Sequence, residues 1–465
     1  MNRLGNELNK LVNRSLDRHV RLAVTGLSRA GKTAFITSLV NQLMHVSTNP
    51  RLPLFGAVRD GHLLGAKRVP QLDMHVPKFG YEEGISALLA TPPDWPTPTK
   101  DVSQTRIALR YKPQKGPLKL LQDSATLYLD IIDYPGEWLL DLPLLEMDFL
   151  TWSRQQAKAL KGKREELAQQ WLEEGETFDP LAPADEAAIE RLSARFTEYL
   201  FKCKAEGGLH WVQPGRFVLP GELAGAPVLQ FFPLVWLDKL SEQELAAAGD
   251  DTNIGMLKSR YRYYQQHVVK AFYKEHFSKF DRQIILVDCL QPLNAGPESF
   301  NDMRQALDQL MQSFRYGRSS LLRRLFSPRI DKVLFAATKA DHVTPEQHPN
   351  LVSLMQQLVN EAWQTASFEG IKMDCISLSS IQATAPGFVE YQGKQVPALR
   401  GVTMSGETKT LFPGEVPRRL PGDDFWQQSG FDFMNFRPLN IQSDEPLPHI
   451  RMDKALDYLL GDKLR

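Results

Sequence analysis

The strongest constraint on this chain is a glycine-rich loop between a short apolar run and a helical pattern. Residues 26–33 read GLSRAGKT and match G-x-x-x-x-G-K-[ST], the phosphate-binding P-loop. The run 20–25 before the loop is typical of a buried strand, and Phe35, Leu39 and Leu43 follow it at helical spacing. A strand, a glycine loop and a helix N-terminus together point backbone N–H groups at phosphate oxygens. We therefore predict a nucleotide-binding α/β domain with a mostly parallel sheet flanked by helices.

Two side chains of this loop have distinct expected roles. Lys32 should reach the β- and γ-phosphates and assist catalysis, and the Thr33 hydroxyl should bind Mg²⁺. The other expected nucleotide contacts of the loop come from Gly26, Ser28, Arg29, Ala30, Gly31 and Ala34.

A second motif supplies a carboxylate for the Mg²⁺ site. The β-rich run 125–132 ends in Asp133, and Asp133 with Gly136 forms the D-x-x-G of GTPases. We expect Asp133 to bind Mg²⁺ through water and the Gly136 N–H to sense the γ-phosphate. Glu137 follows, where Ras-like enzymes keep a water-positioning glutamine. A carboxylate there can accept a proton from water but repels the γ-phosphate, so we expect slow intrinsic turnover.

A third motif is suited to recognising guanine. Thr338, Lys339 and Asp341 form T-K-x-D after the buried run 331–337. The Asp341 carboxylate would accept the N1–H and N2 amino protons of guanine, which adenine does not offer in that geometry. Further along, the run 374–378 is followed by the residues that should form the serine turn on guanine O6, namely Ser379, Ser380 and Ile381. The order of these motifs, each after a strand, predicts a GTP- and GDP-binding domain.

The switch I threonine has two candidates in the sequence. Strand 105–113 should pair with 125–133, and switch I must present a Mg²⁺-binding threonine shortly before that hairpin. We expect Thr99 to be this ligand, with Thr97 as the alternative.

The motifs divide the chain into segments. We expect an amphipathic, mildly basic helix over 1–19, a GTPase domain over 20–139 and 281–385, a mostly helical insertion over 140–280, and a C-terminal extension over 386–465 packed on the GTPase domain. The extension should contain a hairpin around residues 391–393 and a last helix at 452–460. For the N-terminal helix, packing on the GTPase domain and contact with a membrane surface or a partner both stay open.

Composition excludes several other classes. The formal net charge is zero, which argues against a large electrostatic footprint for nucleic acid. Cys203, Cys289 and Cys375 are far apart, so we expect neither a disulfide framework nor a zinc site. No apolar stretch reaches membrane-spanning length, and no apolar core follows the basic start, so we expect a cytoplasmic protein.

With these motifs in place, the chain resembles the YcjX family of bacterial stress-associated P-loop proteins. The resemblance lies in the stretches RLAVTGLSRAGKTAFIT, DYPGEWLLDLP, PGRFVLPGE, DRQIILVDCLQPLN, FAATKADHV and FPGEVPRRLPG. It implies a cytoplasmic, stress-induced protein with a Ras-like nucleotide domain. Such proteins have been described as predicted ATPases, and the T-K-x-D here favours GTP.

The P-loop is also similar to that of guanylate-binding proteins and atlastins, which carry an arginine at the position of Arg29. The resemblance implies that Arg29 acts as an arginine finger in cis, engaged on dimerisation. A solvent-exposed or salt-bridged Arg29 is the alternative.

Two other functions remain open at this point. GTP binding could order the switches with negligible hydrolysis, so that switch II and the insertion dock a protein partner. The chain could also be an ATPase.

Overall fold

The computed structural model describes residues 18–99, 101–115, 119, 123–312, 330–368, 370–391, 393–428, 430–431, 433–442 and 445–465. By their internal contacts the residues form two compact units. Unit 1 comprises Met1–Tyr134, Phe280–Asn294 and Arg329–Arg465, and unit 2 comprises Pro135–Lys279 and Ala295–Pro328. The P-loop and the T-K-x-D motif belong to unit 1, and the segment after Asp133-x-x-Gly136 belongs to unit 2.

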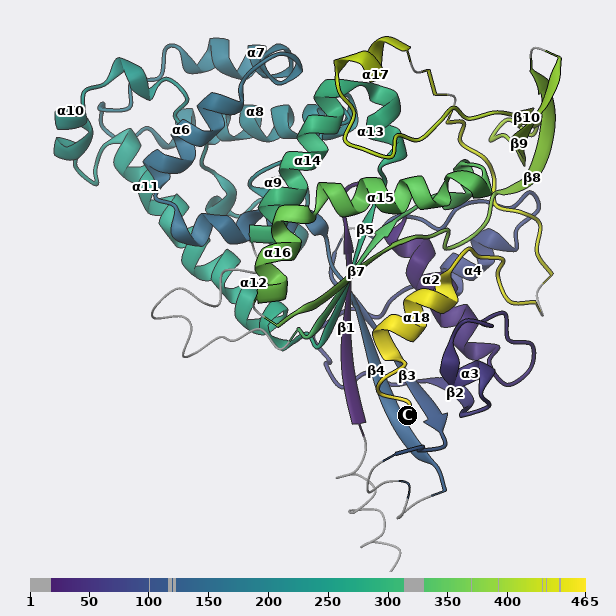
Figure 1. Cartoon of the computed structure of the whole chain (residues 1–465). Coiled ribbons are helices and arrows are strands. Elements are labelled where there is room, and N and C mark those ends of the chain that lie inside the picture. Colours follow the sequence, from purple (N-terminus) through teal and green to yellow (C-terminus); the bar gives the residue numbers. More distant parts are fainter. Residues whose placement is uncertain are drawn as a thin grey trace, which may run out of the picture. The chain divides into compact units, whose positions relative to one another are not determined.

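A twisted sheet forms the centre of unit 1 (Figure 1). Among the described residues it has seven strands in the order β2-β3-β4-β1-β5-β6-β7. Their bounds are β1 Arg18–Gly26, β2 Leu63–Val69, β3 Ser103–Tyr111, β4 Ala125–Asp133, β5 Arg282–Val287, β6 Lys332–Ala337 and β7 Lys372–Ser377. Strands β4, β1, β5, β6 and β7 run parallel, and β3 is antiparallel to both β2 and β4. The predicted α/β fold with a mostly parallel sheet is confirmed.

The predicted hairpin is present, and the sheet extends one strand beyond it. Strand β3 pairs with β4 from Ser103 opposite Asp133 to Tyr111 opposite Ala125. On its other edge, β3 pairs with β2, a strand between the P-loop and the hairpin that the motifs did not predict. The sequence of β2, LLGAKRV, lacks regular alternation of apolar and polar residues, and most of its residues are only partly buried, so it carries little strand signal.

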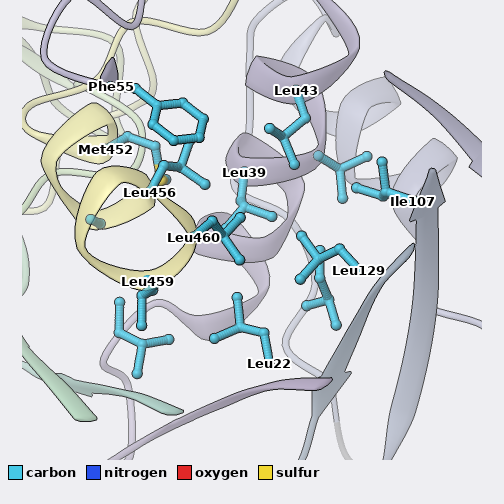
Figure 2. Packing of buried hydrophobic residues seen from close by; sticks show 14 of the residues in the cluster. Leu22, Leu39, Leu43, Phe55, Ile107, Leu129, Met452, Leu456, Leu459 and Leu460 are labelled. Atoms are coloured by element: carbon cyan, nitrogen blue, oxygen red, sulfur yellow. The ribbon is translucent and has the colours of Figure 1, made fainter. Parts of the chain in front are cut away.

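One face of the sheet is covered by helices from opposite ends of the chain. Helix α2 (Lys32–Met44) follows the P-loop, and α18 (Met452–Leu460) comes from the predicted C-terminal extension. Figure 2 shows Leu456, Leu459 and Leu460 of α18 in the same cluster as Leu39 of α2 and Leu22 of β1. All five side chains are fully buried. Helix α18 is therefore part of the core of unit 1.

The other parts of unit 1 surround this core. Alternate strand residues such as Val333 and Phe335 are buried as well, and α15 (His348–Leu358) contacts β6 and β7. Between β7 and α18 lies a separate antiparallel sheet of the described residues, in the order β10-β9-β8. Its strands are β8 Thr384–Tyr391, β9 Lys394–Val402 and β10 Thr408–Leu411. The remaining helices are α3 Gly56–Arg59, α4 Tyr81–Leu88, α13 Leu290–Ala295, α16 Asn360–Phe368 and α17 Asp423–Gln428, with short 3₁₀ turns at η9 Ala340–His342 and η10 Pro345–Gln347.

Unit 2 is helical around an aromatic core. Its elements are η1 Gly136–Glu146, α6 Phe149–Ala159, α7 Lys163–Gly175, α8 Glu186–Ala205, α9 Gly215–Val218, α10 Glu242–Ala247, α11 Asn253–Tyr264, the π-turn η5 Gln265–Val269, α12 Lys270–Glu275 and α14 Pro297–Gln312, with 3₁₀ turns at η2 Gly221–Leu223, η3 Pro227–Leu229, η4 Leu237–Lys239 and η6 Phe277–Lys279. The fully buried Trp152 packs against Phe231 and stacks on Tyr261. Ring packing of this kind supplies much of the apolar burial in a domain without a sheet.

The two units differ from the predicted segments in two places. Unit 2 also contains residues 135–139 and helix α14, because both pack on the insertion. The predicted N-terminal helix falls largely on residues 1–17, which lie outside the described residues, whereas Arg18 and His19 begin β1 and pair with Leu127 and Tyr128. In the described part of the chain, no helix is long and apolar enough to cross a membrane.

Candidate functional site

The P-loop connects β1 to α2 with the backbone geometry that the motif demands. Gly31 has φ 82°, a left-handed conformation that favours glycine. A β carbon on Gly26 would lie 2.6 Å from the Leu286 carbonyl oxygen, so only glycine fits beside β5. Arg29 also has a positive φ, 63°, and is exposed. Within the described residues no hydrogen bond or ion pair holds its guanidinium, which leaves Arg29 available to a ligand.

Side chains from three motifs meet beside this loop. The Lys32 ammonium donates to the Tyr134 carbonyl oxygen at 2.8 Å and lies 3.4 Å from an Asp133 carboxylate oxygen. The Thr33 and Thr99 hydroxyl oxygens are 3.0 Å apart, and the Thr99 N–H donates to Thr33 Oγ1 at 3.3 Å. The structure thus brings together four residues that the sequence predicted for this site, namely Lys32, Thr33, Thr99 and Asp133.

Asp133 and Thr97 differ sharply in their surroundings. Asp133 is buried, and neither of its carboxylate oxygens accepts a hydrogen bond from the residues that the structure describes. A buried carboxylate of this kind is the arrangement expected of a group that binds a cation or its water shell. Thr97 is exposed and makes no such contact with the P-loop among the described residues.

Gly136 and Glu137 are placed in unit 2. Both are buried, and the Glu137 carboxylate binds the Lys204 ammonium of α8 at 2.6 Å. The residue predicted to position water is therefore engaged by the insertion. This pair has no signature in the sequence, because the partners lie 67 positions apart in different predicted segments.

The T-K-x-D motif ends β6 on the same edge of the sheet as the P-loop. Thr338 donates its N–H to the Val287 carbonyl at 2.9 Å, and Lys339 has a positive φ of 58°. Asp341 is buried, and its carboxylate accepts the Ala383 N–H at 2.8 Å. Burial favours the neutral acid, but the His342 ring and the Ala383 N–H outweigh it and hold the pKa of Asp341 below its ordinary value. A charged acceptor therefore stands at the predicted base-reading position.

The serine turn lies beside Asp341 as predicted from the chain order. The Ser379 hydroxyl donates to the Ile381 carbonyl at 3.1 Å, and Ser380 between them is partly exposed. Ser379 also pairs through both backbone groups with Ile450, just before α18. The C-terminal segment therefore holds the turn in place.

Sequence reasoning missed one charged residue of this edge. Asp288 follows β5 directly, is buried, and binds the Lys339 ammonium at 2.6 Å. Burial opposes its charge, but Lys339 outweighs it and holds the pKa of Asp288 below its ordinary value. The signal was present: Asp288 ends a strand parallel to the strands that carry Asp133 and Thr338, and ligand-binding groups of such sheets gather at these carboxyl ends.

We call the site of Lys32, Thr33, Thr99 and Asp133 the phosphate edge, and the site formed by residues 338–341 and 379–381 the base edge. A model of the YcjX-like family matches residues 20–464. The chain belongs to the YcjX-like family. It is 59% identical to the Ras-like GTPase YcjX of Escherichia coli (strain K12) over 466 residues, covering 100% of both chains. It is 44% identical to the Ras-like GTPase YcjX of Shewanella oneidensis over 477 residues, covering 100% of this chain and 98% of that protein.

Membership of the family agrees with the sheet. The mostly parallel seven-stranded sheet of the described residues, with a P-loop between β1 and α2, is a Ras-like P-loop α/β fold. The resemblance predicted from the motifs is confirmed for the family and for the fold.

Proposed function

We propose that this chain binds GTP and GDP with Mg²⁺ and hydrolyses GTP slowly. The observation that carries the proposal is the meeting of Lys32, Thr33, Thr99 and Asp133 beside the P-loop. These residues come from three separate motifs, and their convergence serves no evident packing purpose. The names of both relatives, each a Ras-like GTPase, support the same conclusion.

The residues beside the P-loop suit Mg²⁺. This ion prefers oxygen ligands and keeps several waters, so it is commonly held by few protein groups. Two hydroxyls and one buried carboxylate without a hydrogen-bond donor satisfy that preference. We assign Thr33 and Thr99 as ligands and Asp133 as a ligand through water. When bound, Mg²⁺ would neutralise charge on the β- and γ-phosphates.

The protein groups divide the remaining work. Lys32 would bind the phosphates, and the P-loop N–H groups would orient them for in-line attack. Arg29 is exposed and unpaired among the described residues, so it could add positive charge at the transferring phosphoryl group, including on dimerisation. The Gly136 N–H would sense the γ-phosphate. Glu137 would position water, and its charge next to the γ-phosphate is one cause of the slow turnover in this proposal.

The base edge supports GTP over ATP. Asp341 is charged, and its carboxylate can accept the two guanine protons that adenine lacks. Lys339 would cover the base, and the turn of Ser379, Ser380 and Ile381 would meet guanine O6. The role in a stress response rests on the family resemblance and is part of the same proposal.

The test is competition between nucleotides on the full chain. We expect GTP and GDP to displace a fluorescent GDP at far lower concentration than ATP, and chelation of Mg²⁺ to weaken GTP binding. Equal competition by ATP would reject the guanine assignment. Thr99→Ala should raise the Mg²⁺ concentration needed for GTP binding, and Thr97→Ala is the matched control.

A nucleotide-gated interaction module is the second candidate. The observation that favours it is the Glu137–Lys204 pair, which commits the water-positioning residue to the insertion. In that function the nucleotide state would control docking of a protein partner on switch II and the insertion. Single-turnover measurements decide between the two: GTP that stays intact while tightly bound supports the module.

A further inference from the structure

The segment that follows Gly136 is anchored in unit 2 at nearly every turn. Side chains and backbone of the insertion bind it as follows: Lys204 holds Glu137, Leu219 accepts from the Trp138 indole, Gln213 donates to the Leu140 carbonyl, and Gly215 and Tyr264 donate to Asp141. The Arg216 guanidinium covers the Trp138 ring at 3.2 Å from its centroid. We call residues 136–146 the anchored segment.

The first anchor is an ion pair with little access to water. The Glu137 side chain is 7% exposed and that of Lys204 is 23% exposed. A lysine–carboxylate contact of 2.6 Å is a charge-assisted hydrogen bond, and burial strengthens it because water no longer screens the charges. The carboxylate of Glu137 is therefore held by a specific partner.

The backbone of Glu137 is held from a second side. A β carbon on Gly215 would lie 2.1 Å from the Glu137 carbonyl oxygen, so α9 reaches this backbone only because residue 215 is glycine. The main chain of Glu137 is thus packed in place, and release of its carboxylate requires that the bond to Lys204 breaks.

We propose that Lys204 is a positioning residue that latches Glu137 and thereby restrains GTP hydrolysis. The proposal rests on the proposed function. A carboxylate oxygen that accepts a hydrogen bond from the Lys204 ammonium cannot also accept one from the attacking water in the same direction. Hydrolysis at full rate then requires a state in which the pair is broken. A protein partner or a nucleotide-driven shift that competes for Lys204 would raise the rate.

The experiment uses the full chain and four variants. Lys204→Met removes the charge at similar length, and Lys204→Arg keeps it. Glu137→Ala combined with Lys204→Met tests whether any gain depends on the Glu137 side chain. Lys202→Met is the matched control, because Lys202 lies on the same helix and pairs with Glu198 at the surface.

We expect two results from Lys204→Met. Amide hydrogen exchange across residues 136–146, measured without nucleotide, should become faster than in wild type and in Lys202→Met. Single-turnover GTP hydrolysis should rise by about tenfold or more, since proton transfer to a positioned side chain such as the Glu137 carboxylate is worth about 10²–10⁴ in rate. Lys204→Arg should stay close to wild type, and the double variant should lose the gain.

The outcomes separate the two proposals. Unchanged exchange, or a hydrolysis rate in folded Lys204→Met at or below that of wild type, overturns the latch. If Lys204→Met does not fold, the other two variants provide the test. The latch is then overturned if the double variant folds and Lys204→Arg hydrolyses GTP faster than wild type. If wild type binds no guanine nucleotide, the proposed function and the restraint on hydrolysis both fail, and exchange alone shows whether Lys204 holds the segment.

Discussion

The phosphate edge of unit 1 and the anchored segment of unit 2 follow each other directly in the chain, yet their polar side chains are treated in opposite ways. Beside the P-loop, Asp133 accepts no hydrogen bond among the described residues, and Arg29 is exposed there without a protein partner. In the anchored segment, Glu137 and Asp141 are both buried and both bound by the insertion.

The difference shows how one chain can separate binding from control. Groups whose hydrogen-bonding capacity the protein leaves unused are prepared for a ligand, since a buried polar group without hydrogen bonds is costly until something binds it. Groups that are fully engaged define a single conformation and must exchange partners before they act elsewhere. We therefore expect substitutions in the first region to change nucleotide binding or the chemical step directly, and substitutions in the second to change stability and the release of Glu137.

The largest expected effect is on triphosphate binding. Lys32→Ala should weaken GTP binding by roughly a hundredfold or more. Charge-assisted contacts are worth about 1.5–3 kcal/mol each, and Lys32 would contact two phosphates. Equilibrium titration with a fluorescent GTP analogue measures this. Lys67→Ala, at an exposed lysine of β2, is the control. Wild-type affinity in a folded Lys32→Ala would move the phosphate site away from the P-loop.

The next effect concerns the base. Asp341→Asn should weaken GTP and GDP by roughly thirtyfold, in line with about 2 kcal/mol for a hydrogen bond to a charged group. The same variant should gain affinity for xanthosine nucleotides, whose base presents an acceptor where guanine has its amino group. Competition titrations with both nucleotides test this, and unchanged selectivity would remove Asp341 from the base site.

Arg29 tests whether an available group contributes to the reaction itself. Arg29→Ala should lower the single-turnover rate about tenfold or more while leaving GDP affinity nearly unchanged, as for a contact made mainly in the transition state. If dimerisation positions the arginine, specific activity should rise with protein concentration. Equal rates for both proteins at every concentration would leave Arg29 as a surface charge.

The smallest effect concerns the pH dependence of stability in the engaged region. Burial raises the pKa of Asp141 to about 7, against the opposing hydrogen bonds from Tyr264 and Gly215. The folded state then binds a proton that the unfolded chain has lost, so this group's contribution to stability falls as the pH rises from about 4 to about 7. Asp141→Asn should remove that fall.

Urea unfolding at pH 5 and pH 8 measures this last prediction. The change in the free energy of unfolding caused by Asp141→Asn should favour the folded state more at pH 8 than at pH 5, by at least about 1 kcal/mol. Identical pH dependence in both proteins would show that Asp141 is charged throughout the range.

What the sequence could predict depends on the range of the interactions. The P-loop, the hairpin and helix 452–460 are local patterns, set by turn chemistry and by periodicity, and the structure has all three. The contact between Thr99 and Thr33 spans 66 positions. A Mg²⁺ site of this kind requires a threonine shortly before the hairpin, so the sequence limited the candidate ligands to two threonines.

Other features have no local signature. The Lys204–Glu137 pair depends on how the insertion folds back, and a single charged residue in a helix gives no hint of its partner. Strand β2 was missed because its residues face both solvent and protein without alternation. The position of α18 in the core depends on a sheet assembled from distant segments, although the helix itself was predicted.

The place of α18 in the core has a consequence for folding during synthesis of the protein. During synthesis, the P-loop and α2 leave the ribosome long before the α18 leucines that cover α2 and β1. Until α18 has been made, Leu39 and its neighbours lack part of their apolar cover, so the nascent chain exposes apolar surface. The core of unit 1 is complete only once α18 has been made, and a ribosome stalled before α18 would release a chain that has every nucleotide motif but lacks part of its core.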